Sequence, residues 1–446
     1  MGAFEGFGNI GKLPELRSRV LFTLGLLAVY RVGIYITVPG VNRTALAQSM
    51  ASSSSGLVSF FNMFSGGAMQ NASVFYLGIM PYISASIVFQ LLTMVVKPLE
   101  EMRKEGEAGQ RKINQYMRYA TVLIATAQGI FWALQLQAKK ANEAAGITAD
   151  VVAHTGVGFV FTSVLTWVTG TMFLMWIGER ITERGVGNGT SLLIFAGIVD
   201  GIPGALFNYF QANQGNIQPL NVALVGFMVL ACVAVVVFFE RGQRRIPIYY
   251  ARRIVGKRVY GGQNSHLPLK VNTAGTIGPI FASALLTAPA YLANVKFLPG
   301  MAALAGLAQR GDWAFNVVYG ALIIFFCFFY TSVQLPAIEV ADNLKKQQAF
   351  IPGIRQGKAT AEYIDYVLTR VTLGGALYIA AVCIFPTVIS NWLRVPFQWG
   401  GTSIMIVVGV ALETASQVEA HLISRQYDGL AEGGGRAGVL RGRREA

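Results

Sequence analysis

Ten long apolar runs constrain this chain more than any other feature of its sequence. They lie at residues 20–38, 74–96, 117–137, 156–178, 190–208, 220–239, 271–292, 314–334, 367–389 and 402–420. A helix that crosses the hydrocarbon core of a bilayer needs about 20 mostly apolar residues, so each run predicts one transmembrane helix. The composition agrees, because only 13% of the 446 residues are charged, whereas soluble proteins average about 25%.

The distribution of basic residues predicts the orientation of these helices. The alternate connections that include both termini hold 27 of the 36 Lys and Arg residues, and the opposite connections hold 6. Cytoplasmic loops of membrane proteins carry the excess of positive charge. We therefore expect both termini in the cytoplasm, with residues 1–19 as an amphipathic segment at the membrane surface and residues 422–446 as a basic tail.

An even count of ten divides the chain into two halves of five spans, residues 20–208 and 209–421. Because each half has an odd number of spans, any structural repeat between them is an inverted one. The sequence itself shows no convincing residue-level repeat. The expected fold is an all-α integral membrane protein with ten transmembrane helices in two five-helix halves related by inverted pseudo-symmetry.

One further apolar segment is too short to span a membrane. It covers residues 56–71 and reads GLVSFFNMFSGGAMQN, with a break at Gly66 and Gly67. Apolar segments of this length are typical of re-entrant or interfacial helices. Two interpretations are almost equally favoured by the residues alone. The segment forms either a short helix that enters a protein cavity from outside or an amphipathic helix on the outer leaflet.

The second predicted span contains Pro81, and the seventh contains Pro279 a turn or so into an otherwise apolar helix. Pro81 and Pro279 each remove a backbone donor, which distorts a helix. In the second span Ile83 and Ile87 share one face, and small residues at 84–86 allow another helix to approach closely. Two deformable helices in different halves suggest a moving contact, although proline kinks are also common in static membrane helices.

Two connections on the basic side, residues 240–270 and 335–365, are larger than topology requires. Arg241–Lys270 carries eight basic and no acidic residues, interleaved with apolar and aromatic ones such as Ile246, Ile248 and Tyr249. This alternation predicts a hairpin that projects from the membrane and docks an acidic partner, including nucleic acid. For residues 240–270, docking of a partner is favoured over the alternative that the basic residues only fix the orientation of the spans. For residues 335–365 the two interpretations are equally favoured.

The sequence contains no constellation for catalysis, cofactor binding or metal binding. The three cysteines lie within apolar runs, and the three histidines are widely scattered. Gly6–Leu13 matches a phosphate-binding loop only superficially, since Leu13 occupies the position where magnesium needs Ser or Thr. Acidic residues occur in spans at Asp200, Glu413 and Glu419, but none has an ionisable partner that the sequence identifies.

Several motifs, in order along nearly the whole chain, resemble the SecY family, the channel-forming subunits of the bacterial protein-conducting translocon. They are FSGG at 64–67, GIMPYISASI at 78–87, ITERGVGNG at 181–189, ERGQRR at 240–245, HLPLKVN at 266–272, ADNLKK at 341–346 and PGIR at 352–355. The resemblance implies an hourglass channel that passes unfolded polypeptides across the membrane and releases hydrophobic segments sideways into lipid.

The resemblance also implies roles for particular residues. Residues 57–70 would form a plug, with Phe60, Phe61, Met63, Phe64, Ser65, Gly66 and Gly67 as its central residues. A constriction ring would consist of Ile83, Ile87, Ile194, Ile277 and Ile406. A lateral gate between spans two and seven would include Ser84, Ser86, Gln90, Asn272, Thr276 and Ser283. Docking of a motor or ribosome would use Arg241, Arg244, Arg245, Arg252, Arg253, Lys257, Arg258, Lys345, Lys346 and, as the sharpest single candidate, Arg355.

The partners that the resemblance implies are small membrane subunits like SecE and SecG, the SecA motor ATPase, the ribosome, translocating polypeptides with their signal peptides, and the lipid bilayer. The expected location is the cytoplasmic (inner) membrane of a bacterium, and no cofactor is expected. This chain departs from the family pattern at Thr190, beside the ring, and at Gly278, which separates Ile277 from Pro279.

Two other functions are compatible with ten spans. A secondary transporter of a small solute would need an ion-coordinating group at a broken helix near the midplane, and the sequence shows no convincing acid pair. A non-conducting scaffold or insertase-like assembly factor would need the basic loops but no pore. A polypeptide channel accounts for both the short apolar segment and the basic loops.

Overall fold

The structure is a computed structural model of the whole chain. It describes residues 14–52, 62, 64–138, 150–212, 219–250, 253–255, 258–260, 264–292, 313–393 and 401–441. The predicted N-terminal segment 1–19 and basic tail 422–446 therefore lie partly outside the described residues.

The described elements of the N-terminal half are helices. Their bounds are α2 Pro14–Ile34, α3 Arg43–Ser52, α5 Met80–Val95, α6 Lys97–Lys104, α7 Glu107–Ala138, α8 Val157–Arg184 and α9 Gly189–Ala212.

The C-terminal half contains both helices and strands. The helices are α10 Pro219–Arg241, α11 Ile277–Leu292, α13 Trp313–Gln334, α14 Ala337–Lys346, α15 Lys358–Leu393 and α16 Gly401–Arg441. The strands are β1 Gln243–Tyr250, β2 Arg253–Val255, β3 Arg258–Tyr260, β4 Asn264–Lys270 and β5 Ala349–Phe350.

Each of the ten predicted apolar runs overlaps one helix, namely α2, α5, α7, α8, α9, α10, α11, α13, α15 and α16. Within the described residues, five helices are long and apolar enough to cross a membrane, or six if the bent pair α5 and α6 forms one span. Shorter apolar helices occur at Gly189–Gly204 and Ile277–Leu286. The chain is thus a mostly helical membrane protein with several apolar spans.

The helices pack mainly within their own half. In the first half α7 packs on α5 and α8, and α8 also contacts α2 and α9. In the second half α15 packs on α13 and α16, and α13 contacts α11. Across the described elements, extensive packing between the halves occurs where α9 meets α16, so the two halves are joined along one side.

The two prolines predicted to kink their spans instead lie where helices begin. Pro81 occupies the first turn of α5, and residues 74–79 before it are turns rather than helix. Pro279 lies in the first turn of α11, which begins at Ile277. The missing donor of proline has no cost in the first turn, where backbone N–H groups have no helical partner anyway. The expectation of a distortion within these two helices is therefore wrong.

The expectation of an all-α fold also needs correction. Loop 240–270 forms the predicted hairpin, with β1 antiparallel to β4 from Gln243 opposite Lys270 to Tyr249 opposite Asn264. On its other edge β1 pairs with β5 from loop 335–365, with Tyr249 opposite Phe350. The alternation of polar and apolar residues that predicts the hairpin is the period of a strand with one buried face, so this region folds as a small sheet.

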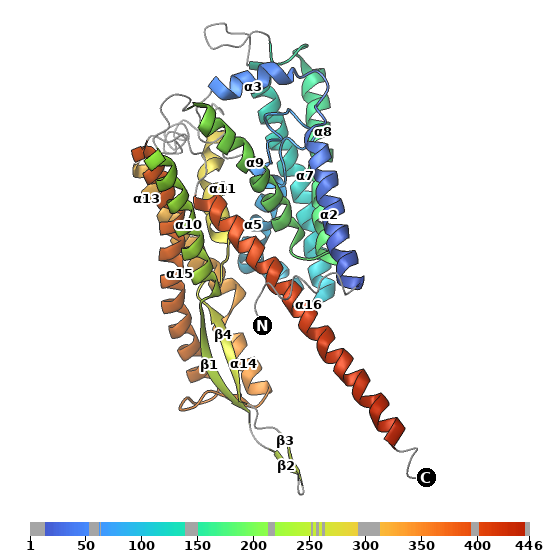
Figure 1. Cartoon of the computed structure of the whole chain (residues 1–446), viewed down its shortest axis with the longest axis vertical. Helices are drawn as coiled ribbons and strands as arrows, with labels where there is room; N and C mark the ends of the chain where they lie inside the picture. Colours follow the sequence, from blue (N-terminus) through green and yellow to red (C-terminus); the bar gives the residue numbers. More distant parts are fainter. Residues whose placement is uncertain are drawn as a thin grey trace.

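The two basic loops form a single folded unit with its own core. Apolar side chains from β1, β4, α14, β5 and the start of α15 pack together, including Ile246, Ile248, Leu344 and Ile364. Figure 1 shows this unit at one end of the molecule, with β2 and β3 projecting beyond it and α3 at the opposite end. The basic unit and α3, which belongs to the predicted external connection 39–73, therefore lie at opposite ends (Figure 1).

Candidate functional site: a central apolar constriction

The five isoleucines of the predicted ring come from four helices and belong to one apolar cluster. Ile83 and Ile87 lie on α5, Ile194 on α9, Ile277 on α11 and Ile406 on α16, so both halves contribute. Four of them are less than 10% exposed, and Ile277 is half-buried against the same cluster. The surroundings hold apolar side chains, which offer no ligand to a hydrated ion.

The predicted plug is described only in part. Phe60, Phe61 and Met63 lie outside the described residues, whereas Phe64, Ser65 and Gly66 are buried and Gly67 is half-buried. Phe64 belongs to the same apolar cluster as the ring isoleucines. The described part is a series of turns held by Asn62, whose carbonyl accepts a hydrogen bond from the Gly67 N–H at 2.8 Å. Its burial among helices agrees with a segment that enters the protein.

The chain that leaves this segment passes between α2 and α8. Phe75 stacks on Tyr30 of α2 and on Phe173 of α8, with ring centroids 6.0 and 6.1 Å apart. Both flanking helices have a glycine at the contact, since a Cβ on Gly33 would meet the Phe75 ring and one on Gly170 would meet the Val74 carbonyl. These small residues allow the backbone at 74–75 to lie close to both helices.

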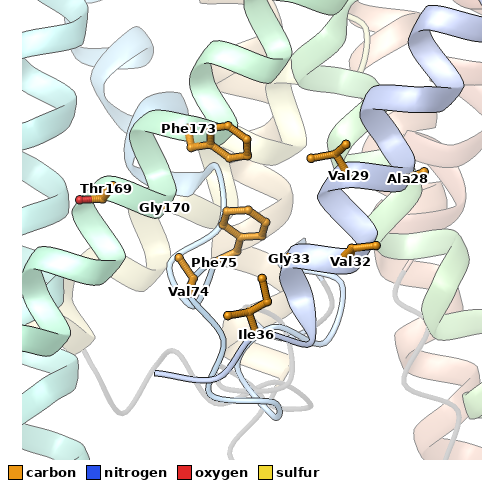
Figure 2. A pocket seen from close by; sticks show the side chains of 10 residues that line it. All are labelled: Ala28, Val29, Val32, Gly33, Ile36, Val74, Phe75, Thr169, Gly170 and Phe173. Atoms are coloured by element: carbon orange, nitrogen blue, oxygen red, sulfur yellow. The ribbon is translucent and has the colours of Figure 1, made fainter. Parts of the chain in front are cut away.

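An apolar cavity of about 540 Å³ opens beside this contact. Figure 2 shows Phe75 and Phe173 facing Val29 and Gly33 of α2 across it. Val29 and Val32 in its lining are 47% and 65% exposed, so the cavity lies at the outer face of the helices rather than at the ring.

The predicted gate residues on α5 border a second cavity, of about 250 Å³. Ser86 and Gln90 line it from α5, Arg103 from α6, and Tyr330 and Gln334 from α13. The Gln90 amide donates to the Ser86 hydroxyl at 3.3 Å, and the Arg103 guanidinium donates to the Val333 carbonyl at 3.4 Å. The second contact joins the two halves on the side of the basic unit. Ser84 is half-buried on the same helix.

The predicted gate residues of the seventh span lie near the start of α11 and pack within their own half. Thr276 lies against α16, because a Cβ on Gly409 would be 2.9 Å from its Cγ2 atom. The buried Ser283 hydroxyl donates to the Ile280 carbonyl at 2.8 Å. Gly278, the departure from the family pattern, lets α11 approach the Cys327 sulfur of α13.

Asn272 belongs to a buried polar cluster that sequence reasoning missed. Its amide donates to Glu240 Oε1 at 2.5 Å, and the Tyr378 hydroxyl donates to the same oxygen at 2.8 Å. Glu240 lies in the last turn of α10 and Tyr378 lies within α15, so the cluster ties three segments of the C-terminal half together. No local signal in the sequence pairs these residues, because they are 32 and 138 positions apart.

The basic residues predicted to dock a partner are placed on the folded unit where the structure describes them. Arg241, Arg244, Arg245, Lys345, Lys346 and Arg355 are exposed. Arg253 and Arg258 lie on β2 and β3, of which only the backbone is described, and Arg252 and Lys257 are outside the described residues. Arg355 follows β5 in a loop fixed by a hydrogen bond from the Gln356 amide to the Ala349 carbonyl at 3.2 Å.

A metal site needs several ligating side chains close together. In the part of the chain that the structure describes, no three His, Cys, Asp or Glu side chains are grouped so that they could hold a metal ion. The described residues do offer three features: an apolar cluster to which both halves contribute, a buried segment that packs on it and a charged unit at one end (Figure 1).

Comparison with known proteins shows the family and the fold of this chain. Residues 73–415 match the SecY family model. The chain is 48% identical over 424 residues to the protein translocase subunit SecY of Escherichia coli K12, with 94% of each chain covered.

Two solved structures share the fold. One is a SecY protein whose plug domain is described as stabilising the closed state of the translocation channel and maintaining a membrane seal (TM-score 0.60, 16% identity, 93% of this chain and 96% of that chain). The other is Sec61 in the canine ribosome-channel complex (TM-score 0.59, 15% identity, 93% and 96%).

Proposed function

The chain belongs to the SecY family, and from that premise we propose that polypeptides cross the membrane between its two halves, through the isoleucine ring. As a member of this family it is a protein-conducting translocation channel of the Sec pathway, a transporter and not an enzyme. The observation that carries the proposed path is the convergence of Ile83, Ile87, Ile194, Ile277 and Ile406 from both halves on one apolar cluster.

The proposed topology has ten spans in two inverted five-helix halves, residues 20–208 and 209–421, with both termini in the cytoplasm of a bacterium. Ten helices overlap the ten apolar runs, and the basic residues are concentrated on alternate connections. The separation of α3 from the basic unit in Figure 1 supports the same orientation. Helix α11 would complete its span with the non-helical residues 271–276.

The ring would seal the resting channel because it is narrow and apolar. A hydrated ion finds no ligand there, so a constriction of this kind excludes ions by dewetting. Aliphatic side chains can still move aside and close around an extended peptide of any sequence. The energy for transport would come from a partner, since the sequence offers no nucleotide site.

Residues 57–70 would act as the plug on the outer side of the ring. The burial of Phe64, Ser65 and Gly66 supports this role over that of a helix on the outer leaflet. A plug that stabilises the closed state is described for a solved relative with the same fold. In this chain the plug would have to leave its site before a polypeptide passes.

The lateral gate would open on the side opposite the α9–α16 contact. Extensive packing joins the halves at α9 and α16, whereas Ser86 and Gln90 of α5 border a cavity, so the halves could separate along α5. We retain Ser84, Ser86, Gln90, Thr276 and Ser283 as gate residues, and Asn272 as a residue that fixes the base of the gate. Through such an opening a Leu, Ile, Phe or Val gains about 0.3–0.6 kcal/mol in lipid, whereas a charged residue costs roughly 2.5–3.5 kcal/mol.

The folded basic unit would be the docking surface for the partner that supplies the chain. Its exposed residues Arg241, Arg244, Arg245 and Arg355 form a positive surface at the predicted cytoplasmic end. A relative with the same fold is seen in a ribosome-channel complex. We propose that the ribosome and a SecA-like motor bind here, and that small subunits like SecE and SecG bind within the membrane.

Site-specific photocrosslinking tests the proposed path. A photoreactive residue is placed at Ile83 or Ile87, in membranes where a secretory chain is stalled partway through export. Crosslinks to the chain from both positions, absent without it, are expected if the polypeptide passes the ring. A matched probe at Val88, which is exposed on the same helix, should capture lipid instead. Capture of the chain only by the basic unit would contradict the path through the ring.

A further inference from the structure

An ion pair joins two membrane-spanning helices beside the predicted plug. The Arg31 guanidinium of α2 lies 2.5 Å from the Asp200 carboxylate of α9, and each side chain is about one-third exposed. Ionised side chains within spans are costly and are retained where they have partners or a function. The sequence showed no partner for Asp200. In the structure its ion-pair partner is Arg31, 169 positions earlier in the chain.

The same guanidinium reaches the backbone of the predicted plug. Its Nη1 atom donates to the Gly66 carbonyl at 3.4 Å. The preceding residue, Tyr30, donates its hydroxyl hydrogen to the Ser65 carbonyl at 3.3 Å. Two consecutive carbonyls of the plug thus accept hydrogen bonds from two consecutive side chains of α2.

The plug backbone is close enough to α9 that side chains are excluded from the contact. Gly66 has a φ of +64°, and a Cβ there would lie 2.9 Å from the Cα of Gly197. Gly197 and Asp200 are three residues apart on α9, hence on one face of the helix. The plug carbonyls therefore lie between α2 and the face of α9 that carries Asp200.

The orientation of Arg31 is fixed by further contacts. Its Nη2 atom donates to the Tyr35 hydroxyl at 2.8 Å, and its guanidinium carbon lies 5.1 Å from the centroid of the Tyr35 ring. A guanidinium held by a carboxylate and a neighbouring ring has few other orientations available, so the nitrogen that faces Gly66 is held in place.

We propose that Arg31, oriented by Asp200, is a positioning residue that holds the plug in the closed channel. This inference rests on the proposed function, with the seal of the resting channel shared between the isoleucine ring and the plug, residues 57–70, on its outer side. Displacement of the plug breaks the hydrogen bonds to the Ser65 and Gly66 carbonyls and leaves the Arg31–Asp200 pair behind on the helices. Weakening the pair therefore lowers the cost of displacement without removing any part of the ring or of the docking surface.

The test uses the full channel complex reconstituted in proteoliposomes. Arg31→Gln and Asp200→Asn are each expected to raise the resting ion leak about tenfold, within the usual range of coupling between two conformational states. Arg118→Gln is the matched control, because it removes a 2.8 Å ion pair with Glu179 that joins α7 and α8 away from the plug. Arg31→Lys, which keeps the charge, should restore most of the seal.

A second readout separates plug positioning from general helix packing. Ala68 is fully buried in the plug segment, and a cysteine placed there should react slowly with a water-soluble maleimide added from outside. The three native cysteines are buried. Arg31→Gln should raise the reaction rate at position 68 about tenfold. A lower thermal stability with unchanged leak and unchanged reactivity would overturn the proposal, since the pair would then only join α2 to α9.

Deletion of residues 57–70 distinguishes failure of this inference from failure of the proposed function. One outcome is that the channel without residues 57–70 leaks ions while Arg31→Gln and Asp200→Asn leak no more than the unmodified channel. In that case the segment is the plug, and the positioning role of Arg31 is wrong. If the channel without residues 57–70 does not leak, the ring alone makes the seal, and both the plug role of the segment and the positioning role of Arg31 are wrong, whereas the path through the ring is still tested by the crosslinks from Ile83 and Ile87.

Discussion

At the scale of single residues, Tyr378 illustrates how one buried hydroxyl joins α15 to the end of α10. Its ring stacks on Phe239 with a centroid distance of 4.3 Å, and its hydroxyl donates to Glu240. Tyr378→Phe keeps the ring and removes the hydrogen bond. We expect a loss of about 1.5–3 kcal/mol in the free energy of unfolding, the usual contribution of a hydrogen bond to a charged group, measured by denaturant unfolding in detergent.

Tyr366→Phe is the control for this prediction because it lies on the same helix and is 53% exposed, with its ring under Arg370. It should leave the free energy of unfolding nearly unchanged. If the two variants have equal free energies of unfolding, the hydrogen bond from Tyr378 to Glu240 does not stabilise the packing of α15.

The sequence predicts isolated properties of these residues better than their pairings. Ile83 and Ile87 could be assigned to one buried face of a helix from their spacing, and both are buried. Asp200 could be recognised as an acidic residue within a span, but its partner Arg31 comes from a distant segment. The hydrogen bond between Tyr378 and Glu240 likewise joins distant segments. Nothing local specifies such a pair, because it depends on how the helices pack.

At the scale of elements, the turn segment before α5 depends on a close approach to α8. A Cβ on Gly170 would meet the Val74 backbone carbonyl, which cannot move aside as a flexible side chain could. Gly170→Ala is therefore expected to displace residues 74–75 and destabilise the protein by about 1–3 kcal/mol, as other overpacked sites do. Thermal unfolding of the purified channel measures this effect.

Gly158→Ala provides a matched substitution on α8, since a Cβ at that position has nothing within 4 Å. It should be neutral or slightly stabilising, because alanine favours the helix. A destabilisation as large as that of Gly170→Ala would mean that the loss comes from the helix and not from the contact with Val74.

Elements differ in how far local sequence determines them. The ten apolar runs each contain a helix because hydrophobicity over about 20 residues is a property of one segment. The β1–β4 hairpin follows from an alternating pattern within one loop. The pairing of β1 with β5 joins two loops separated by two spans, and β5 has only two residues, too few for a recognisable pattern. The sequence shows that Pro81 and Pro279 lie within apolar runs, but only the structure shows that each lies in the first turn of its helix, α5 or α11.

At the scale of the whole molecule, the two basic loops fold into one unit, and Arg355 is the residue of that unit that we propose first for docking. Arg355→Glu is expected to lower motor-driven export about tenfold or more, since reversing one central charged contact commonly costs 2 kcal/mol or more. Export is measured as uptake of a secretory protein by inverted membrane vesicles. Channel folding should be unaffected because Arg355 is exposed.

Lys112→Glu makes the same change of charge at another exposed position on the predicted cytoplasmic side, near the start of α7. It should export nearly as well as the unmodified channel. If Arg355→Glu exports as well as the unmodified channel, Arg355 does not belong to the docking surface. If both variants lose export equally, the loss comes from the overall charge of the predicted cytoplasmic face.

The arrangement of the halves makes a prediction about which side must open. They pack extensively at α9 and α16, and on the other side Arg103 of α6 donates to the Val333 carbonyl of α13. Cysteines replacing Arg103 and Val333, joined by a bismaleimide, would tether the halves where the gate is proposed. Cysteines replacing Val186 and Val418, which share a small apolar cluster, would tether them beside α9 and α16.

Because opening of the gate separates the halves along α5 while the opposite side stays packed, the first tether should abolish most export and the second should leave most of it. Both are measured by uptake of a secretory protein into inverted vesicles, with the extent of tethering determined on the same samples. Full export with the Arg103–Val333 tether complete would contradict a gate on that side. Loss of export with only the Val186–Val418 tether would place the required movement at α9 and α16, and the channel would then open by sliding of the two halves instead of by separation about a joined edge.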